Sequence, residues 1–157
     1  MNSYDIAEVV SKVVEKLSKK MTLEIAGKLA MRVEEKAREI GVNAVVAITD
    51  SGANPVLVHS MDDAYIASYD IALNKAYTVV SLKMPTKALK ELAAPGGSLY
   101  GIQFTNQGRI VIFGGGNPLY SGDKIVGGLG VSGGTEEQDT FLSEYGASVF
   151  EEILKNL

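Results

Sequence analysis

The sequence contains no cysteine and a single histidine, His59. Disulfide bonds, thiolate metal sites and cysteine nucleophiles are therefore excluded. Metal sites built from several histidines and most histidine-dependent catalytic triads are excluded as well. No apolar run reaches the roughly 18 residues that a membrane-spanning helix needs, and charges interrupt the N-terminal segment too often for a signal peptide. These absences predict a cytoplasmic protein with no membrane partner.

Basic charge is also scarce, since 15 Lys and Arg stand against 19 Asp and Glu, for a net charge of -4. Proteins that bind nucleic-acid backbones normally carry a basic face, so we expect no nucleic-acid partner. A small anionic ligand stays compatible with this balance, because local fields matter more than net charge. The length of 157 residues predicts one domain with room for a core.

The apolar periodicity predicts helices and strands in one α+β domain. The predicted helices cover residues 3–20, 21–41, 64–84, 86–93 and 135–154. The predicted strands cover residues 42–50, 56–61, 109–113, 119–120 and 125–133. Thr22 is the expected N-cap of the second helix, and Thr135 and Gln138 have the spacing of a capping box. Short connections favour antiparallel pairing, which predicts an antiparallel sheet of about five strands with flanking helices.

Glycine-rich stretches raise the question of a nucleotide loop. The segment "RIVIFGGGNPLY" does not fit the Walker pattern, and "GLGVSG" matches Gly-x-Gly-x-x-Gly without the βαβ unit that a dinucleotide fold requires. Strand alternation places Gly128 and Gly130 on one nearly bare face of the last predicted strand. Such a face permits close helix packing or the approach of a ligand. We favour helix packing.

Several residues are candidates for ligand binding. Gly133 and Gly134 precede Thr135 at a predicted helix start, where free N–H groups suit an anion. The run Gly114, Gly115 and Gly116 exceeds what a turn requires, which indicates close approach of the backbone to a ligand or another subunit. Lys75 and Arg109 are the cationic candidates for a carboxylate or propionate.

His59 is the only imidazole for haem ligation or acid–base chemistry, although a lone histidine is more often a surface or satisfied residue. Tyrosines could ligate or stack on a porphyrin, but amphipathic packing is the simpler interpretation; they are Tyr65, Tyr69, Tyr77, Tyr100 and Tyr120. No pair of carboxylates and no nucleophile–base pair stands out. We therefore assign no catalytic residue and no metal site.

Four motifs, "MDDAYIASYDIALNKAYT", "PGGSLYG", "VIFGGGNPL" and "GGLGVSGGTEEQD", together resemble the GlcG/HbpS family, which includes the C-terminal domain of PduO-type proteins. The resemblance covers roughly residues 21 to 145. It implies a profilin-like fold and a homo-oligomer. The PduO adenosyltransferase activity belongs to a different domain. The matching positions are Asp50, Met61, Asp62, Asp70, Lys75, Pro85, Thr86, Gly96, Gly97, Gly114 to Gly116, Pro118, Gly133, Gly134, Thr135 and Asp139.

The resemblance also implies a function. Some members of the family bind haem, and others belong to operons for glycolate, propanediol or ethanolamine metabolism. We therefore expect a small-ligand or tetrapyrrole (haem or corrinoid) binding accessory protein of a cytoplasmic catabolic pathway. The alternative is an enzyme acting on a small hydroxy acid, aldehyde or corrinoid. Haem binding in the family is linked to a histidine near the first helix of the domain, and this chain has none there. The expected cofactor residues are His59, Lys75, Arg109, Gly114, Gly115, Gly116, Gly133, Gly134 and Thr135.

Residues 1–20 precede the region of resemblance and form an extension before the domain at residues 21–157. Aliphatic residues recur on one face of the predicted helix and charges fill the other. A helix of this length is marginal alone in water, so we expect it to fold against a surface. That surface is its own domain, a neighbouring subunit or the groove of a partner. In relatives from propanediol and ethanolamine operons, such helices look like signals for encapsulation in bacterial microcompartments, with a shell protein as partner.

Overall fold

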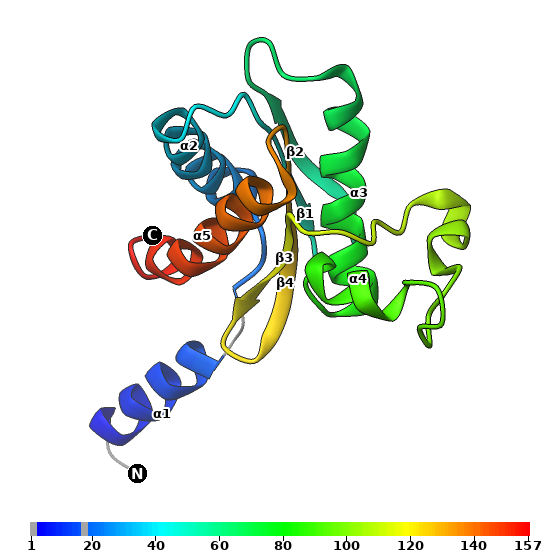
Figure 1. The fold of residues 1–157 in the computed structure, drawn as a ribbon. Coiled ribbons are helices and arrows are strands. Elements are labelled where there is room, and N and C mark those ends of the chain that lie inside the picture. Colours follow the sequence, from blue (N-terminus) through cyan, green and yellow to red (C-terminus); the bar gives the residue numbers. More distant parts are fainter. Residues whose placement is uncertain (1–2, 17–18) are drawn as a thin grey trace.

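The computed structural model describes residues 3–16 and 19–157 (Figure 1). A four-stranded sheet forms the centre, with β1 (Val45–Asp50), β2 (Pro55–Ser60), β3 (Gly116–Ser121) and β4 (Lys124–Ser132). The order is β2-β1-β4-β3, and every neighbouring pair is antiparallel. The chain therefore has the predicted α+β fold with an antiparallel sheet.

Helices cover both faces of the sheet (Figure 1). On one face lie α2 (Leu23–Glu39) and α5 (Glu136–Lys155), which pack on each other and on the strands around the main apolar core. On the other face lies α3 (Ile66–Leu82), followed by the short α4 (Leu89–Leu92). Short 3-10 helices occupy Thr86–Ala88, Ile102–Phe104 and Asn106–Gly108. The arrangement is three layers, helix on sheet on helix.

The N-terminal helix α1 (Ser3–Lys16) projects away from this body (Figure 1). The predicted helix 3–20 is thus shorter than expected, because Lys19 and Lys20 are not helical and residues 17–18 lie outside the described part of the chain. Within the described residues, no helix combines the length and apolar character that crossing a membrane requires.

Local signals set the helix starts as the sequence predicts. The Thr22 hydroxyl accepts a hydrogen bond from the Ile25 amide at 3.2 Å, which caps α2. At α5, the Thr135 hydroxyl accepts from the Gln138 amide and the Gln138 side chain accepts from the Thr135 amide. The capping box predicted from the spacing is confirmed.

The bare glycine face of β4 is a packing surface for α3. A Cβ atom at Gly130 would lie 1.9 Å from the carbonyl oxygen of Ala72, and one at Gly128 would lie 2.3 Å from that of Ala76. No side chain fits in that space, so the glycines let helix and sheet backbones touch. The packing interpretation is confirmed.

The sheet has four strands where about five were predicted, and the segment "RIVIF" is the error. Residues 109–115 form no strand, and β3 begins only at Gly116. Part of this backbone contacts a side chain, because the Thr78 hydroxyl accepts from the Val111 amide at 3.0 Å and shares its hydrogen between the carbonyl oxygens of Asn74 at 2.7 Å and Arg109 at 3.2 Å. Pro118, taken as a strand break, lies inside β3, where an edge strand tolerates a residue without an N–H donor.

Candidate functional site

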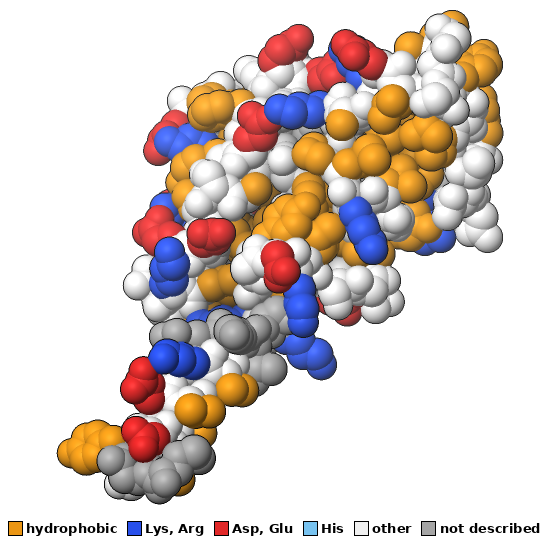
Figure 2. All heavy atoms as spheres, turned by 90° about the horizontal axis from the view of Figure 1, so that it is seen from below, with side chains coloured by type: hydrophobic (Ala, Val, Ile, Leu, Met, Phe, Trp, Pro, Cys, Tyr) orange, Lys and Arg blue, Asp and Glu red, His pale blue; other side chains and the backbone are white. Residues whose placement is uncertain are grey.

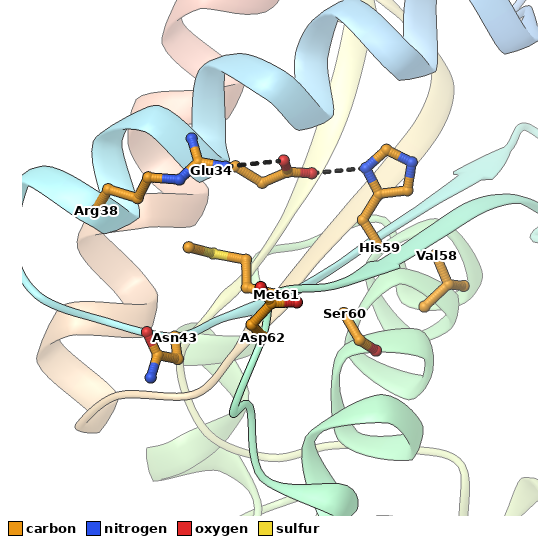
Figure 3. A pocket seen from close by; sticks show the side chains of 8 residues that line it. All are labelled: Glu34, Arg38, Asn43, Val58, His59, Ser60, Met61 and Asp62. Carbon is orange, nitrogen blue, oxygen red and sulfur yellow. Dashed lines mark hydrogen bonds and ion pairs between the residues drawn. The ribbon is translucent and has the colours of Figure 1, made fainter.

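An open groove of about 590 Å³ lies between α2 and β2 (Figure 3). It contains the chain's single histidine together with acidic, basic, amide and thioether side chains. The residues that line it are Glu34, Arg38, Asn43, Val58, His59, Ser60, Met61 and Asp62. Its volume falls within the range of about 300–1,000 Å³ that small-molecule sites occupy.

Two periodicities bring the polar groups of the groove together. Strand alternation turns His59 and Met61 toward α2, as Figure 3 shows. On α2, Glu34 and Arg38 are one turn apart and share a face. Glu34 Oε1 lies 2.6 Å from His59 Nδ1, and Glu34 Oε2 lies 3.7 Å from Arg38 Nη2. A carboxylate with only 13% of its side chain exposed thus bridges an imidazole and a guanidinium.

This geometry determines what the imidazole can do. When Nδ1 donates its hydrogen to the Glu34 carboxylate, Nε2 carries the lone pair. Histidines that ligate metals are oriented in the same way, with the other ring nitrogen donating to a carboxylate. The His59 side chain is 42% exposed, and Figure 3 shows Nε2 on the side of the ring that faces away from Glu34. Arg38 adds a cation at 61% exposure, which suits a carboxylate on a bound ligand.

A second hollow of about 450 Å³ adjoins the groove and shares Asn43 with it. Gly133, Gly134 and Thr135 line this hollow at the start of α5. The amides there are engaged, because the Gly134 amide donates to Asp139 Oδ1 at 2.8 Å and the Thr135 amide donates to Gln138 Oε1 at 2.9 Å. An anion would have to displace these side chains to reach the helix start.

Lys75 lies elsewhere, in a fully buried network. Its ammonium donates to the Val131 carbonyl oxygen at 2.7 Å and to Asp139 Oδ2 at 3.1 Å. Burial lowers the pKa of Lys75, and the Asp139 carboxylate opposes that shift. These two contacts join α3, β4 and α5. The Lys75 side chain is 0% exposed, so it presents no surface to solvent.

The three glycines of "GGGNP" surround the same network. A Cβ atom at Gly115 would lie 2.4 Å from Lys75 Nζ, and one at Gly114 would lie 2.0 Å from Thr140 Oγ1. The Gly116 amide donates to Thr86 Oγ1 at 2.9 Å. The close approach that the glycine run indicates is therefore to side chains of the same chain.

Arg109 occupies a third place, beside α3 on the opposite face of the sheet from the groove. Its guanidinium carbon lies 3.9 Å from the centre of the Tyr77 ring, and Nη2 donates to the Tyr77 hydroxyl at 3.2 Å. The Asn106 amide donates to the same hydroxyl at 3.1 Å. Hydrogen bonds from Asn106 and with Ser81, together with the Arg109 charge, lower the pKa of Tyr77.

The structure thus places His59 in one hollow and Gly133, Gly134 and Thr135 in the adjoining one, and neither hollow includes Arg109 or the buried Lys75. Sequence reasoning missed Glu34, Arg38 and Asn43. The spacing of Glu34 and Arg38 placed them on one helix face, but nothing in the sequence said which strand that face would meet.

Comparison with known proteins assigns the chain to a family. A family model described as "Haem degrading protein HbpS-like" matches residues 21–148. The chain belongs to the HbpS-like family. The match begins after α1, so that helix precedes the family domain.

The relatives agree with this assignment. The chain is 50% identical over 133 residues to an uncharacterized 15.0 kDa protein in the dhaT-dhaS intergenic region of Citrobacter freundii, covering 85% of this chain and 94% of that one. It is 38% identical over 110 residues to the corrinoid adenosyltransferase PduO of Salmonella typhimurium, covering 70% of this chain and 33% of PduO. The chain therefore spans only about a third of PduO.

Solved structures share the fold. The Klebsiella pneumoniae protein ORFY superposes with a TM-score of 0.82 at 44% identity, over 87% of this chain and 94% of that one. A structure described as a PduOC:heme complex superposes with a TM-score of 0.80 at 33% identity, over 83% of this chain and 94% of that one. The predicted family resemblance is confirmed.

Proposed function

We propose that the chain binds a tetrapyrrole, with haem as the first candidate, in the groove between α2 and β2. In this proposal His59 would hold the tetrapyrrole through Nε2, and Arg38 would pair with a carboxylate of the ligand. The observation that carries it is the 2.6 Å contact of His59 Nδ1 with Glu34, in a groove open to solvent. The description of a family relative as a haem complex supports the choice of ligand.

The residues present fit such a group. An imidazole held by a carboxylate is a ligand for haem iron, and the neighbouring hollow extends the available space past Asn43. Bound haem would supply a redox-active iron to the groove. The chain's residues orient the imidazole, hold the hydrogen on Nδ1 and neutralise ligand carboxylates. Corrinoids, which also take an axial imidazole, are the second ligand class to test.

Titration with ferric haem tests the proposal. We expect a saturable Soret shift that His59→Ala abolishes. Arg109→Ala is the matched control, because Arg109 lies across the sheet and its removal should leave the shift unchanged. The proposal is wrong if His59→Ala binds haem as tightly as the unmodified chain. Cobalamin titrated in parallel distinguishes a corrinoid protein from a haem protein.

Haem turnover is a second candidate function, and the family description "Haem degrading" favours it. An accessory binding protein and an enzyme differ in the fate of the bound haem. With a reductant and oxygen, a degrading enzyme loses the Soret band irreversibly and releases iron, while a binding protein returns its haem intact on extraction. His59→Ala, which we expect not to hold the haem, supplies the background rate.

A homo-oligomer belongs to the same proposal. Large apolar side chains are exposed at the start of α3 and in the segment 98–113, including Ile66 at 97% and Phe104 at 82%. Figure 2 shows hydrophobic side chains gathered on the part of the molecule away from α1. Exposed patches of this kind mark protein contacts. Phe104→Asp should lower the mass measured by light scattering, and an unchanged mass would place the contact elsewhere.

We assign α1 the role of a docking helix for a microcompartment shell protein, which would place the protein and its catabolic pathway inside that compartment. The support is its position before the family domain and its exposed aliphatic face, with Val9, Val10 and Val13 each about half exposed at 52–53%. Residues 1–20 fused to a fluorescent protein should form puncta in cells that express a shell. Val9→Asp should disperse the puncta, and Lys12→Ala, on the charged face, should not.

A further inference from the structure

A shallow groove between α2 and α5 has an apolar floor and charged rims. Met31 and Ile153 form the floor, with Lys28 and Arg32 on one rim and Glu35 and Glu152 nearby. Its volume is about 340 Å³. Met31 is 59% exposed, which is unusual for a large apolar side chain in the middle of a helix that packs on the core. The groove is therefore a surface suited to an amphipathic partner.

The helix α1 carries a matching apolar stripe. Ile6, Val9, Val10 and Val13 lie on one face of α1, and their exposed fractions run from 48% to 53%. Valine and isoleucine are not the strongest helix formers, and a helix of this length is marginal in water without tertiary contacts. The stripe thus needs an apolar surface to stabilise the helix.

Lys19, three residues after the end of α1, is anchored beside α5, which lines one side of this groove. The Lys19 ammonium donates to the carbonyl oxygen of Leu154, the neighbour of Ile153 on α5, and the Lys19 amide donates to Ser121 Oγ at 3.1 Å. Residues 17–22 connect α1 to α2, a length typical of helix–helix connections. A helix that folds back at this point runs antiparallel to α2 over the groove.

The dimensions and charges agree with that placement. The stripe from Ile6 to Val13 and the groove edge from Lys28 to Glu35 each span about 10 Å at 1.5 Å per residue. The groove carries both signs, with Lys28, Arg32 and Glu35 on α2 and Glu152 on α5, and so does α1, where Lys12 pairs with Glu8 at 2.7 Å. Mixed signs on both partners avoid the repulsion that a single-sign helix would meet.

We propose that α1 has a second position, folded back in its own chain, in which its aliphatic stripe covers the groove between α2 and α5. In the extended position of Figure 1 the stripe is available to a partner, and in the folded position it is not. The helix is thereby a strap that opens when a partner competes for the stripe. The inference stands whether or not that partner is a shell protein.

The absence of native cysteine makes a cross-linking test specific. In the full chain, Val9→Cys with Met31→Cys places one thiol on the stripe and one on the groove floor. Glu8→Cys with Met31→Cys is the matched control on the charged face of α1. We expect the first pair to form an intrachain disulfide at least about tenfold faster than the control, because a disulfide requires Cα atoms within about 7 Å. The rate should not depend on protein concentration.

Two results would overturn the proposal: equal rates for the two pairs, or disulfides only between chains, which would assign the groove to α1 of a second copy. Hydrogen exchange gives an independent reading without cysteines. Met31→Asp should speed amide exchange in α1 and leave exchange in the sheet unchanged, and identical α1 exchange in both proteins would contradict folding back. Neither readout depends on shell binding, so failure of the docking role would leave the result interpretable.

Discussion

Two parts of the molecule each pair a basic side chain with a carboxylate. They differ in whether the basic side chain keeps a nitrogen that a ligand can reach. In the interior, Lys75 uses its ammonium on Asp139 and the Val131 carbonyl oxygen, with no exposed surface. In the groove, His59 uses one ring nitrogen on Glu34 and keeps the other. A charged residue among the family motifs can thus be buried in the fold, while the lone histidine outside those motifs keeps a ring nitrogen that the proposed function uses.

The largest effect should come from breaking the interior pair. Lys75→Met leaves the Asp139 carboxylate buried with no cation beside it, which costs about 3–5 kcal/mol of the free energy of unfolding. Urea denaturation measures this loss. The double variant Lys75→Met with Asp139→Leu should recover much of it, because no uncompensated charge remains. A loss below about 1 kcal/mol for the single variant would mean that the pair contributes no more than a surface ion pair does.

Crowding the same network should have the next largest effect. Gly115→Ala places a Cβ atom 2.4 Å from Lys75 Nζ and 2.7 Å from the Val131 carbonyl oxygen. Gly122 is the control, since its φ of +64° is also left-handed but no atom lies within 4 Å of the added Cβ. Gly122→Ala carries a backbone strain of about 1–2 kcal/mol in the left-handed region, and Gly115→Ala should cost about 1–3 kcal/mol more from overpacking, in addition to the greater strain at its φ of +116°. Equal losses would show that the network can move aside.

Weakening the contact between Glu34 and His59 in the groove should lower haem affinity and leave the free energy of unfolding almost unchanged. Glu34→Gln keeps an acceptor for the His59 Nδ1 hydrogen and removes the negative charge. We expect haem affinity to fall by about tenfold, since carboxylates behind metal-ligating histidines contribute about 10–100-fold. The same change should leave the urea midpoint within error of the unmodified chain. A large loss of stability with unchanged haem affinity would mean that the His59–Glu34 pair stabilises the fold and does not serve binding.

The smallest effect concerns pH at the edge of the interior network. The Lys90 side chain and the Gly114 amide donate to Glu136, and these contacts lower the pKa of its carboxyl. A lowered pKa in the folded state gives stability that is present above the unfolded value of about 4.5 and is lost as the pH falls through the folded value. Glu136→Gln should therefore flatten the acid limb of the stability curve below about pH 5. An unchanged limb would contradict the contacts of Glu136.

The fold was largely predictable from the sequence, and the exception has a local cause. Helical periodicity and the caps at Thr22 and Thr135 predicted the helices well, because those signals act within a few residues. "RIVIF" has strand-like composition, yet its Val111 amide and Arg109 carbonyl oxygen contact the Thr78 hydroxyl from α3 in place of a neighbouring strand. A side chain from a distant element is invisible to a local pattern, so the strand was wrongly predicted.

The candidate site was only partly predictable. His59 was found because it is the single imidazole, which composition alone reveals. Glu34 and Arg38 were missed because their contacts with the groove depend on how α2 lies across β2. The glycine runs were correctly judged unusual, and the structure assigns their close contacts to α3, α5 and Lys75. Composition identifies the single histidine and the glycine runs as unusual. Only their neighbours in the folded chain show whether they serve packing or are available for binding.

The central claim is that His59 Nε2 ligates the metal of a bound tetrapyrrole while Nδ1 stays on Glu34. Imidazole ¹⁵N NMR tests this claim directly. Labelled histidine gives a single pair of ring signals, since the chain has one histidine. Addition of a diamagnetic zinc porphyrin should shift the Nε2 resonance strongly and leave Nδ1 close to its starting position against Glu34. Saturable porphyrin binding with neither nitrogen shifted, or with Nδ1 as the nitrogen that shifts, would contradict the account.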